Sequence, residues 1–199
     1  MSGTAAFKVF RAVLYTAYFM VASILAIACW TAFIHEAFRE KGSLRPSTVI
    51  EDIVHSLSGH TPTALASLSN WLRTEADTVG LVSIAAFVAS LVFFTRQNKQ
   101  EVPAWFGAPT AFIALAVFWE VQPDVALWIG TAGFAFSFVI GGFIELWESR
   151  WVCGPERISL MGYQVMNWIF TTAGLVAAPI HLVYELKKLR ATEAHAAPV

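Results

Sequence analysis

Histidine and glutamate residues near the ends of long apolar stretches are the side chains of this sequence best suited to chemistry. His35 ends the first apolar stretch, Glu120 ends the third, and His181 and Glu185 lie near the end of the last. Titratable groups are costly at membrane depth, so residues of this kind are often functional. His181 and Glu185 are four residues apart and therefore share one face of a helix. These four residues are the candidate site.

Three kinds of chemistry are open to this set. Imidazoles and carboxylates together suit a transition metal, so His35, Glu120, His181 and Glu185 are candidate metal ligands. Two imidazoles from separate helices suit a haem iron, which makes His35 and His181 candidate cofactor ligands. The same groups suit a proton relay, and they are also ordinary at span ends, where they meet water and headgroups. No metal, haem or pigment motif is present to choose among these cofactors.

The composition places these residues in a membrane protein. The chain is 57% hydrophobic and 14% charged, with a mean hydropathy of +0.60, whereas a soluble domain carries about 25% charged residues. The apolar residues come in long blocks, which predicts an all-α, polytopic membrane helix bundle with the lipid bilayer as its first partner. The net charge of −1 gives no reason to expect nucleic acid as a partner.

The apolar blocks predict about five transmembrane helices in one membrane domain over residues 1–190. The expected spans are residues 10–38, 78–95, 104–120, 125–147 and 159–187, and residues 191–199 are expected to form a disordered tail.

Residues 39–77 form the only sizeable hydrophilic segment, and they predict two short interfacial amphipathic helices. Thr48-x-x-Glu51 has the pattern of a capping box at the start of the first helix. Thr61 and Pro62 have the pattern of an N-cap and first helical residue for the second.

The predicted topology brings the candidate site together. With five spans, the first, third and fifth run in the same direction, so that His35, Glu120 and His181 are expected at one face of the membrane. Pro179 is expected to bend the fifth helix, because proline removes one helical hydrogen bond. His181 is then expected to face protein rather than lipid, since lipid tails offer no hydrogen-bond partner.

In the same topology the two sides of the membrane carry almost equal numbers of basic residues, so the orientation is poorly determined. Six basic residues are expected on one side and seven on the other, with Lys187, Lys188 and Arg190 opposite Lys8 and Arg11. Because short loops count most in the positive-inside rule, the N-terminus is expected inside. The expected location is a bacterial inner membrane or another energy-transducing membrane.

The sequence therefore favours a non-catalytic accessory or structural subunit of a larger membrane complex, energy-converting or transport, with other membrane subunits as partners. Gly133, Ser137 and Gly141 form a small-residue stripe that suits close helix packing. The alternative is a small carrier, proton-relay or haem or metal redox protein that uses His35, Glu120, His181 and Glu185.

Overall fold

The computed structural model describes residues 3–38, 44–60, 63–96, 107–149 and 168–196, and every element in these ranges is a helix. The labelled helices are α1 (Gly3–Phe38), α2 (Pro46–Ser58), α3 (Thr63–Thr74), α4 (Ala76–Arg96), α5 (Ala108–Val121), α6 (Pro123–Ser149) and α8 (Gly174–Ala196). The all-α prediction is confirmed.

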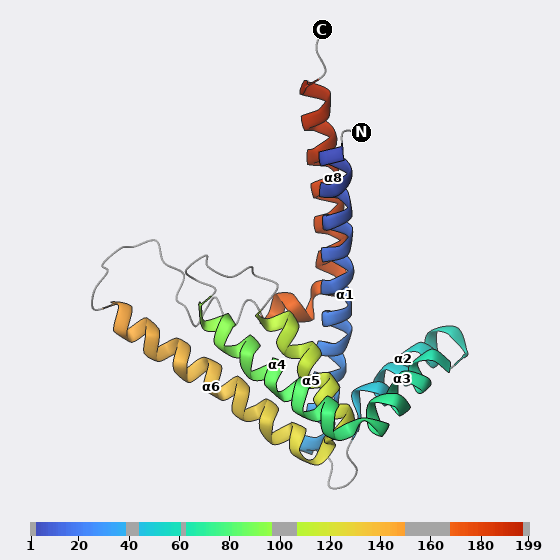
Figure 1. Ribbon diagram of the computed structural model, residues 1–199, viewed down its shortest axis with the longest axis vertical. Coiled ribbons are helices and arrows are strands. Elements are labelled where there is room, and N and C mark those ends of the chain that lie inside the picture. Colours follow the sequence, from blue (N-terminus) through green and yellow to red (C-terminus); the bar gives the residue numbers. More distant parts are fainter. Residues whose placement is uncertain (1–2, 39–43, 61–62, 97–106, 150–167, 197–199) are drawn as a thin grey trace.

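The long helix α1 is the central helix, and α2, α5 and α8 pack against it (Figure 1). Helix α5 packs along the C-terminal half of α1, α4 and α6 pack on α5, and the α2–α3 hairpin projects from the end where α1 finishes. Tyr18 and Thr110 share a hydrogen bond of 2.6 Å at the start of α5, and Trp30 packs against Phe112 further along. Glu36 near the end of α1 and Glu120 near the end of α5 both accept hydrogen bonds from the chain around the start of α2. Helices α1 and α5 therefore run in the same direction, as expected from the sequence.

An aromatic cluster at the centre of the fold joins α1, α5 and α6 to residue 168. The ring centroids of Phe134 and Trp168 lie 4.6 Å apart, those of Phe112 and Trp168 lie 4.9 Å apart, and those of Trp30 and Phe134 lie 5.4 Å apart. Aromatic pairs at this spacing contribute packing energy beyond their buried area. Ten of the 14 residues of α5 are buried, which makes α5 the core helix.

One described helix, Ala6–Phe38 within α1, is long and apolar enough to cross a membrane. A second candidate exists if α3 and Ala76–Val92 of α4 form a single span, although the two are bent by 95°. The apolar helix α5 is shorter, at 14 residues. The described residues thus give one or two candidate spans and do not confirm five. The starts of two expected spans, residues 104–106 and 159–167, lie outside the described residues.

The last helix runs opposite to α1, which corrects the expected direction. Ser23 Oγ donates to the carbonyl of Thr172 at 2.6 Å and accepts from the backbone N–H of Leu175 at 2.9 Å. From this contact α8 extends back along the N-terminal half of α1, so that both chain ends lie at one end of the molecule (Figure 1). Small residues permit this packing, because a Cβ at Gly174 would lie 3.1 Å from the carbonyl oxygen of Phe19.

The hydrophilic segment contains two helices, as predicted, but the capping box does not form. Helix α2 begins at Pro46 with Arg45 as its N-cap and no side-chain cap, so Thr48 already lies within the first turn. Proline is favoured at the first helical position because its φ is preset, and this draws the start of the helix forward. Thr61 and Pro62 lie outside the described residues.

Two expectations for the end of the chain are also wrong. Helix α8 continues to Ala196, so residues 191–196 are helical rather than disordered, in keeping with the high helix propensity of Ala and Glu. His181 is exposed rather than turned toward the bundle.

Candidate functional site

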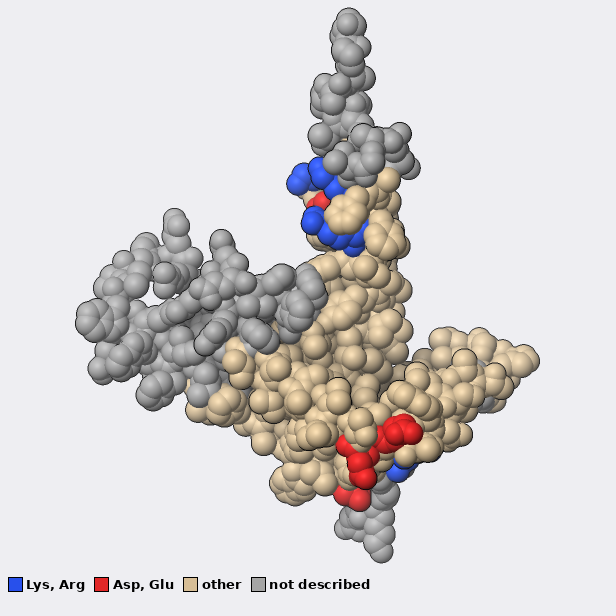
Figure 2. Space-filling view, viewed as in Figure 1, with Lys and Arg blue, Asp and Glu red and all other residues tan. Residues whose placement is uncertain are grey.

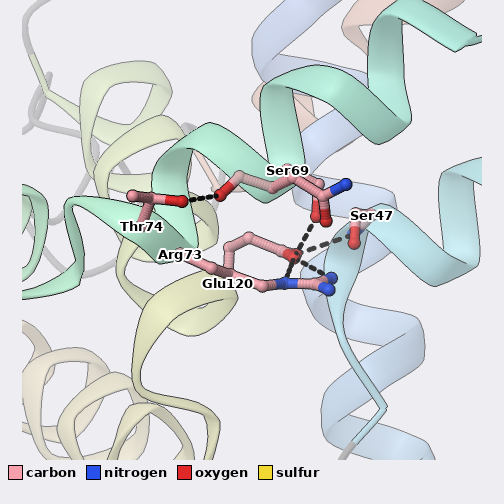
Figure 3. A network of polar contacts seen from close by, with 6 residues as sticks. Ser47, Ser69, Arg73, Thr74 and Glu120 are labelled. Atoms are coloured by element: carbon pink, nitrogen blue, oxygen red, sulfur yellow. Dashed lines mark hydrogen bonds and ion pairs between the residues drawn. The ribbon is translucent and has the colours of Figure 1, made fainter.

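Glu120 is the ionisable side chain that the fold buries most completely among the described residues that carry charge, with 3% of the residue exposed. Its oxygen Oε1 accepts hydrogen bonds from Ser69 Oγ at 2.6 Å, Arg73 Nε at 2.9 Å and Arg73 Nη2 at 2.5 Å. Its oxygen Oε2 accepts a longer bond of 3.4 Å from the backbone N–H of Ser47. Figure 3 shows this network, which links α2, α3 and α5.

Each donor reaches Glu120 because of its place in a helix. Ser69 and Arg73 are four residues apart on α3 and so lie on one face. Ser47 follows Pro46 at the start of α2, where the first backbone N–H groups have no partner within the helix. The positive end of the α2 dipole also favours a carboxylate at this point.

The charge of Glu120 is held by these donors. Burial raises the pKa of Glu120, but hydrogen bonds from Ser69, Ser47 and Arg73, together with the Arg73 charge, lower it by more. The net result is that the pKa of Glu120 is below the ordinary value of 4.5. Glu120 lies outside the candidate membrane spans. The ion pair reaches the surface on one side only, since the side chain of Arg73 is 39% exposed and that of Glu120 is 4% exposed. Glu120 is therefore ionised at neutral pH.

Glu36 supplies a second carboxylate to the same junction. Its Oε1 accepts a hydrogen bond of 2.9 Å from the backbone N–H of Leu44, two residues before α2 begins. Glu36 from α1 and Glu120 from α5 thus bind the backbone on either side of Arg45, and they fix how the chain enters α2.

His35 lies one residue before Glu36 and is half-buried. Its Nδ1 is buried and has no hydrogen-bond partner among the described residues, and the same holds for Ser47 Oγ and Trp119 Nε1. Buried polar atoms are usually hydrogen-bonded. The three atoms come from the end of α1, the start of α2 and the end of α5, so they belong to the elements that form the junction.

The structure does not bring the four predicted site residues together. His35 lies 12 residues beyond Ser23 on α1, while His181 lies 6 residues beyond Leu175 in the opposite direction. At 1.5 Å per residue the two histidines are about 27 Å apart along the helix axes. The coordinating nitrogens of two imidazoles on one metal ion lie within about 4 Å of each other, and histidine side chains are too short to close this gap. Glu185 lies further still from His35. Within the described ranges, no three His, Cys, Asp or Glu residues form a group that could hold a metal ion.

Glu120 could be identified from the sequence, but its partners were not. Ser69 and Arg73 stand at four-residue spacing on a short helix whose other regularly spaced residues are leucines. That spacing was the available signal, because a serine and an arginine on one face of an amphipathic helix can serve one buried acceptor. The backbone N–H of Ser47 could not be identified as a donor from any residue spacing in the sequence.

Such an arrangement is suited to joining helices, because the donors come from α2 and α3 and the acceptor comes from α5. Comparison with family models, with curated proteins and with solved structures finds no match for this chain.

Proposed function

We propose that this chain is an integral membrane protein that serves as a non-catalytic subunit of a larger membrane assembly. The observation that carries this proposal is the exposed apolar surface. Large apolar side chains are exposed along all four long helices, for example Leu14 at 59%, Leu81 at 71%, Trp128 at 73% and Val176 at 68%. Soluble monomers rarely expose continuous apolar patches larger than a few hundred Å².

Lipid covers most of this surface in our proposal. Helix α6 has 27 residues and a length of about 40 Å, and residues 125–144 within it carry no Asp, Glu, Lys or Arg. Helix α4 exposes Leu81, Val82 and Val88. Helices α1, α4 and α6 are thus the proposed spans, α5 is their buried core, and the α2–α3 hairpin lies at the membrane surface.

The outer face of α6 is the proposed contact with another subunit. Val125, Trp128, Phe136 and Val139 are exposed at spacings that place them on one helix face. A different face of α6 packs within the chain, where Gly133 meets Phe87. Exposed tryptophans are enriched among the residues that dominate binding at protein interfaces.

The junction at Glu120 supports a non-catalytic role. Its carboxylate is ionised and already satisfied by Ser69, Arg73 and Ser47, so it is better suited to hold helices than to exchange protons. No observation on the described residues favours the carrier, proton-relay or haem or metal redox alternative.

The test is purification from native membranes in a mild detergent, followed by native mass spectrometry. We expect the chain in a defined complex, and we expect Trp128→Ala to release it from that complex. Leu81→Ala is the matched control, because Leu81 is equally exposed but lies on α4. A wild-type chain that purifies alone as a monomer contradicts the subunit role.

A further inference from the structure

Four basic residues form a collar at the end of the molecule where the two chain ends meet. Lys8 and Arg11 come from α1, Lys187 and Lys188 come from α8, and all four side chains are exposed. Figure 2 shows these cations gathered around the top of the two helices. Among the described side chains one acidic residue, the half-buried Glu185, lies with them, so the described charges of the collar sum to +3 from four positive charges and one negative.

The opposite end of the molecule is acidic (Figure 2). Within the described residues, five carboxylates lie at the helix ends that meet there, together with two basic residues, Arg45 and Arg73. The five are Glu36, Glu75, Asp77, Glu120 and Asp124. Asp77 and Asp124 lie in the first turns of α4 and α6, where the helix dipole favours carboxylates. The described charges therefore give the two ends opposite signs.

The separation of the two ends matches a bilayer. On α1, the 24 residues between Arg11 and Glu36 include no Asp, Glu, Lys or Arg. The step from Arg11 to Glu36 is about 37 Å along the helix. A bilayer has a hydrocarbon core of about 30 Å and a total thickness of about 40–45 Å. Arg11 and Glu36 therefore fall in opposite headgroup layers when α1 crosses the membrane.

An exposed aromatic ring marks the level of the collar on α8. Tyr184 is 64% exposed and lies three and four residues before Lys187 and Lys188, so that it shares their side of the helix. Tyrosine is enriched where a membrane meets water, because its ring is apolar and its hydroxyl is polar.

We propose that the collar of Lys8, Arg11, Lys187 and Lys188 binds the phosphate groups of anionic phospholipids in the cytoplasmic leaflet, and that both chain ends face the cytoplasm. The inference rests on the proposed membrane location. Anionic lipids attract basic residues at the cytoplasmic surface, and basic residues near span ends are retained on that side. The acidic end and the α2–α3 hairpin then face the other side.

Lipid binding is tested by native mass spectrometry of the full chain with phosphatidylglycerol and with phosphatidylcholine. We expect the wild type to bind phosphatidylglycerol more tightly. Lys187→Gln/Lys188→Gln and Lys8→Gln/Arg11→Gln should each weaken that binding, by about five-fold for each charge removed. Arg45→Gln, which removes a positive charge at the acidic end, should leave it unchanged. Equal binding of the two lipids, or equal losses in all three variants, overturns the proposal.

Orientation is tested by labelling single cysteines with a membrane-impermeant maleimide, in a chain that carries Cys29→Ser and Cys153→Ser. We expect Ser56→Cys, on α2, to react in intact cells, and Ala191→Cys, on α8, to react only after the membrane is opened. The reverse pattern overturns the orientation. Extraction of the membranes at alkaline pH separates the two proposals, because release of the wild-type chain contradicts the membrane location itself.

Discussion

Glu120 accepts four hydrogen bonds from three residues, and two of these bonds come from Arg73. A buried charge is costly unless it is paired and hydrogen-bonded. Because the three donors lie on two other helices, the stability of the junction between α2, α3 and α5 depends on this one carboxylate.

Removal of this charge should weaken the fold. Glu120→Gln keeps the shape of the side chain but loses the ion pair, and we expect the free energy of unfolding to fall by about 1–2 kcal/mol. We expect no larger loss of stability, because the side chain of Arg73 is 39% exposed and solvent screens part of its attraction to Glu120. Thermal unfolding in detergent, followed by circular dichroism, measures the change.

Asp52→Asn is the control for Glu120→Gln, because Asp52 is an exposed acidic residue on α2 outside the network. It should change stability by less than about 0.5 kcal/mol. Equal effects of the two substitutions would show that Glu120 has no special role. Arg73→Gln should cost less in the Glu120→Gln background than in the wild type, because the two residues share one interaction.

The Glu120 contribution should also depend on pH. The folded-state pKa of Glu120 is below the ordinary value of 4.5, so the unfolded chain binds a proton at higher pH than the folded chain. Its stabilising contribution is therefore complete above about pH 4.5 and is lost as the pH falls through the folded-state value. The difference in melting temperature between the wild type and Glu120→Gln should be constant near neutral pH and shrink on acidification. A difference that grows as the pH falls contradicts this linkage.

At the scale of elements, α6 packs on α4 through a glycine face. A Cβ at Gly133 would lie 2.5 Å from the ring of Phe87, a side chain that is 2% exposed and enclosed by its neighbours. The predicted small-residue stripe therefore serves packing within the chain at Gly133. The surroundings of Ser137 and Gly141 lie outside what the structure describes.

Gly133→Ala should destabilise the protein by about 1–3 kcal/mol, because the added methyl group overpacks the contact with Phe87. Gly130→Ala is the matched control on the same helix. Its added Cβ would meet only the end of the Leu115 side chain, at 3.2 Å, and alanine favours a helix over glycine by roughly 0.5–1 kcal/mol. Because Leu115 is itself buried, at 1% exposed, this contact offsets part of the gain, and Gly130→Ala should destabilise the protein by less than Gly133→Ala. The opposite ranking of the two variants would show that α4 and α6 pack differently.

Helix type was more predictable from the sequence than helix start and direction. The helical spacing of Val49, Ile50, Ile53 and Leu57 indicates a helix wherever it begins. The first residue of that helix depends on whether Pro46 or Thr48 is the more favourable start, and the two differ little in free energy. The direction of α8 depends on the number of crossings before it, and a 14-residue α5 within the core makes that number hard to count. A non-local pair such as Ser23 and Thr172, 149 residues apart, leaves no local pattern.

At the scale of the whole molecule, the antiparallel packing of α1 and α8 separates His35 from His181 and places both chain ends together. Only part of the candidate site was therefore predictable. Glu120 stands out because it ends an apolar stretch, whereas a common site with His181 required a helix direction that the structure does not have.

Crosslinking distinguishes the two directions of α8. A Cβ at Gly174 would lie 3.3 Å from the Cβ of Ser23, close to the spacing of about 3.5–4.5 Å in disulfides. Ser23→Cys/Gly174→Cys, in a chain carrying Cys29→Ser and Cys153→Ser, should form a disulfide on mild oxidation. His35→Cys/His181→Cys should not, and efficient crosslinking of that pair would restore the direction expected from the sequence.

The depth of α1 in the bilayer tests the central claim, membrane insertion, most directly. Nitroxide spin labels at the exposed positions Leu14, Val21, Ile24, Ile34 and Phe38 sample the length of α1. In reconstituted vesicles, collisions with oxygen should be most frequent at Ile24, midway between Arg11 and Glu36, and collisions with a water-soluble nickel chelate should increase toward Phe38. Frequent collisions with the chelate at all five positions would show that α1 lies in water, and would contradict the membrane location.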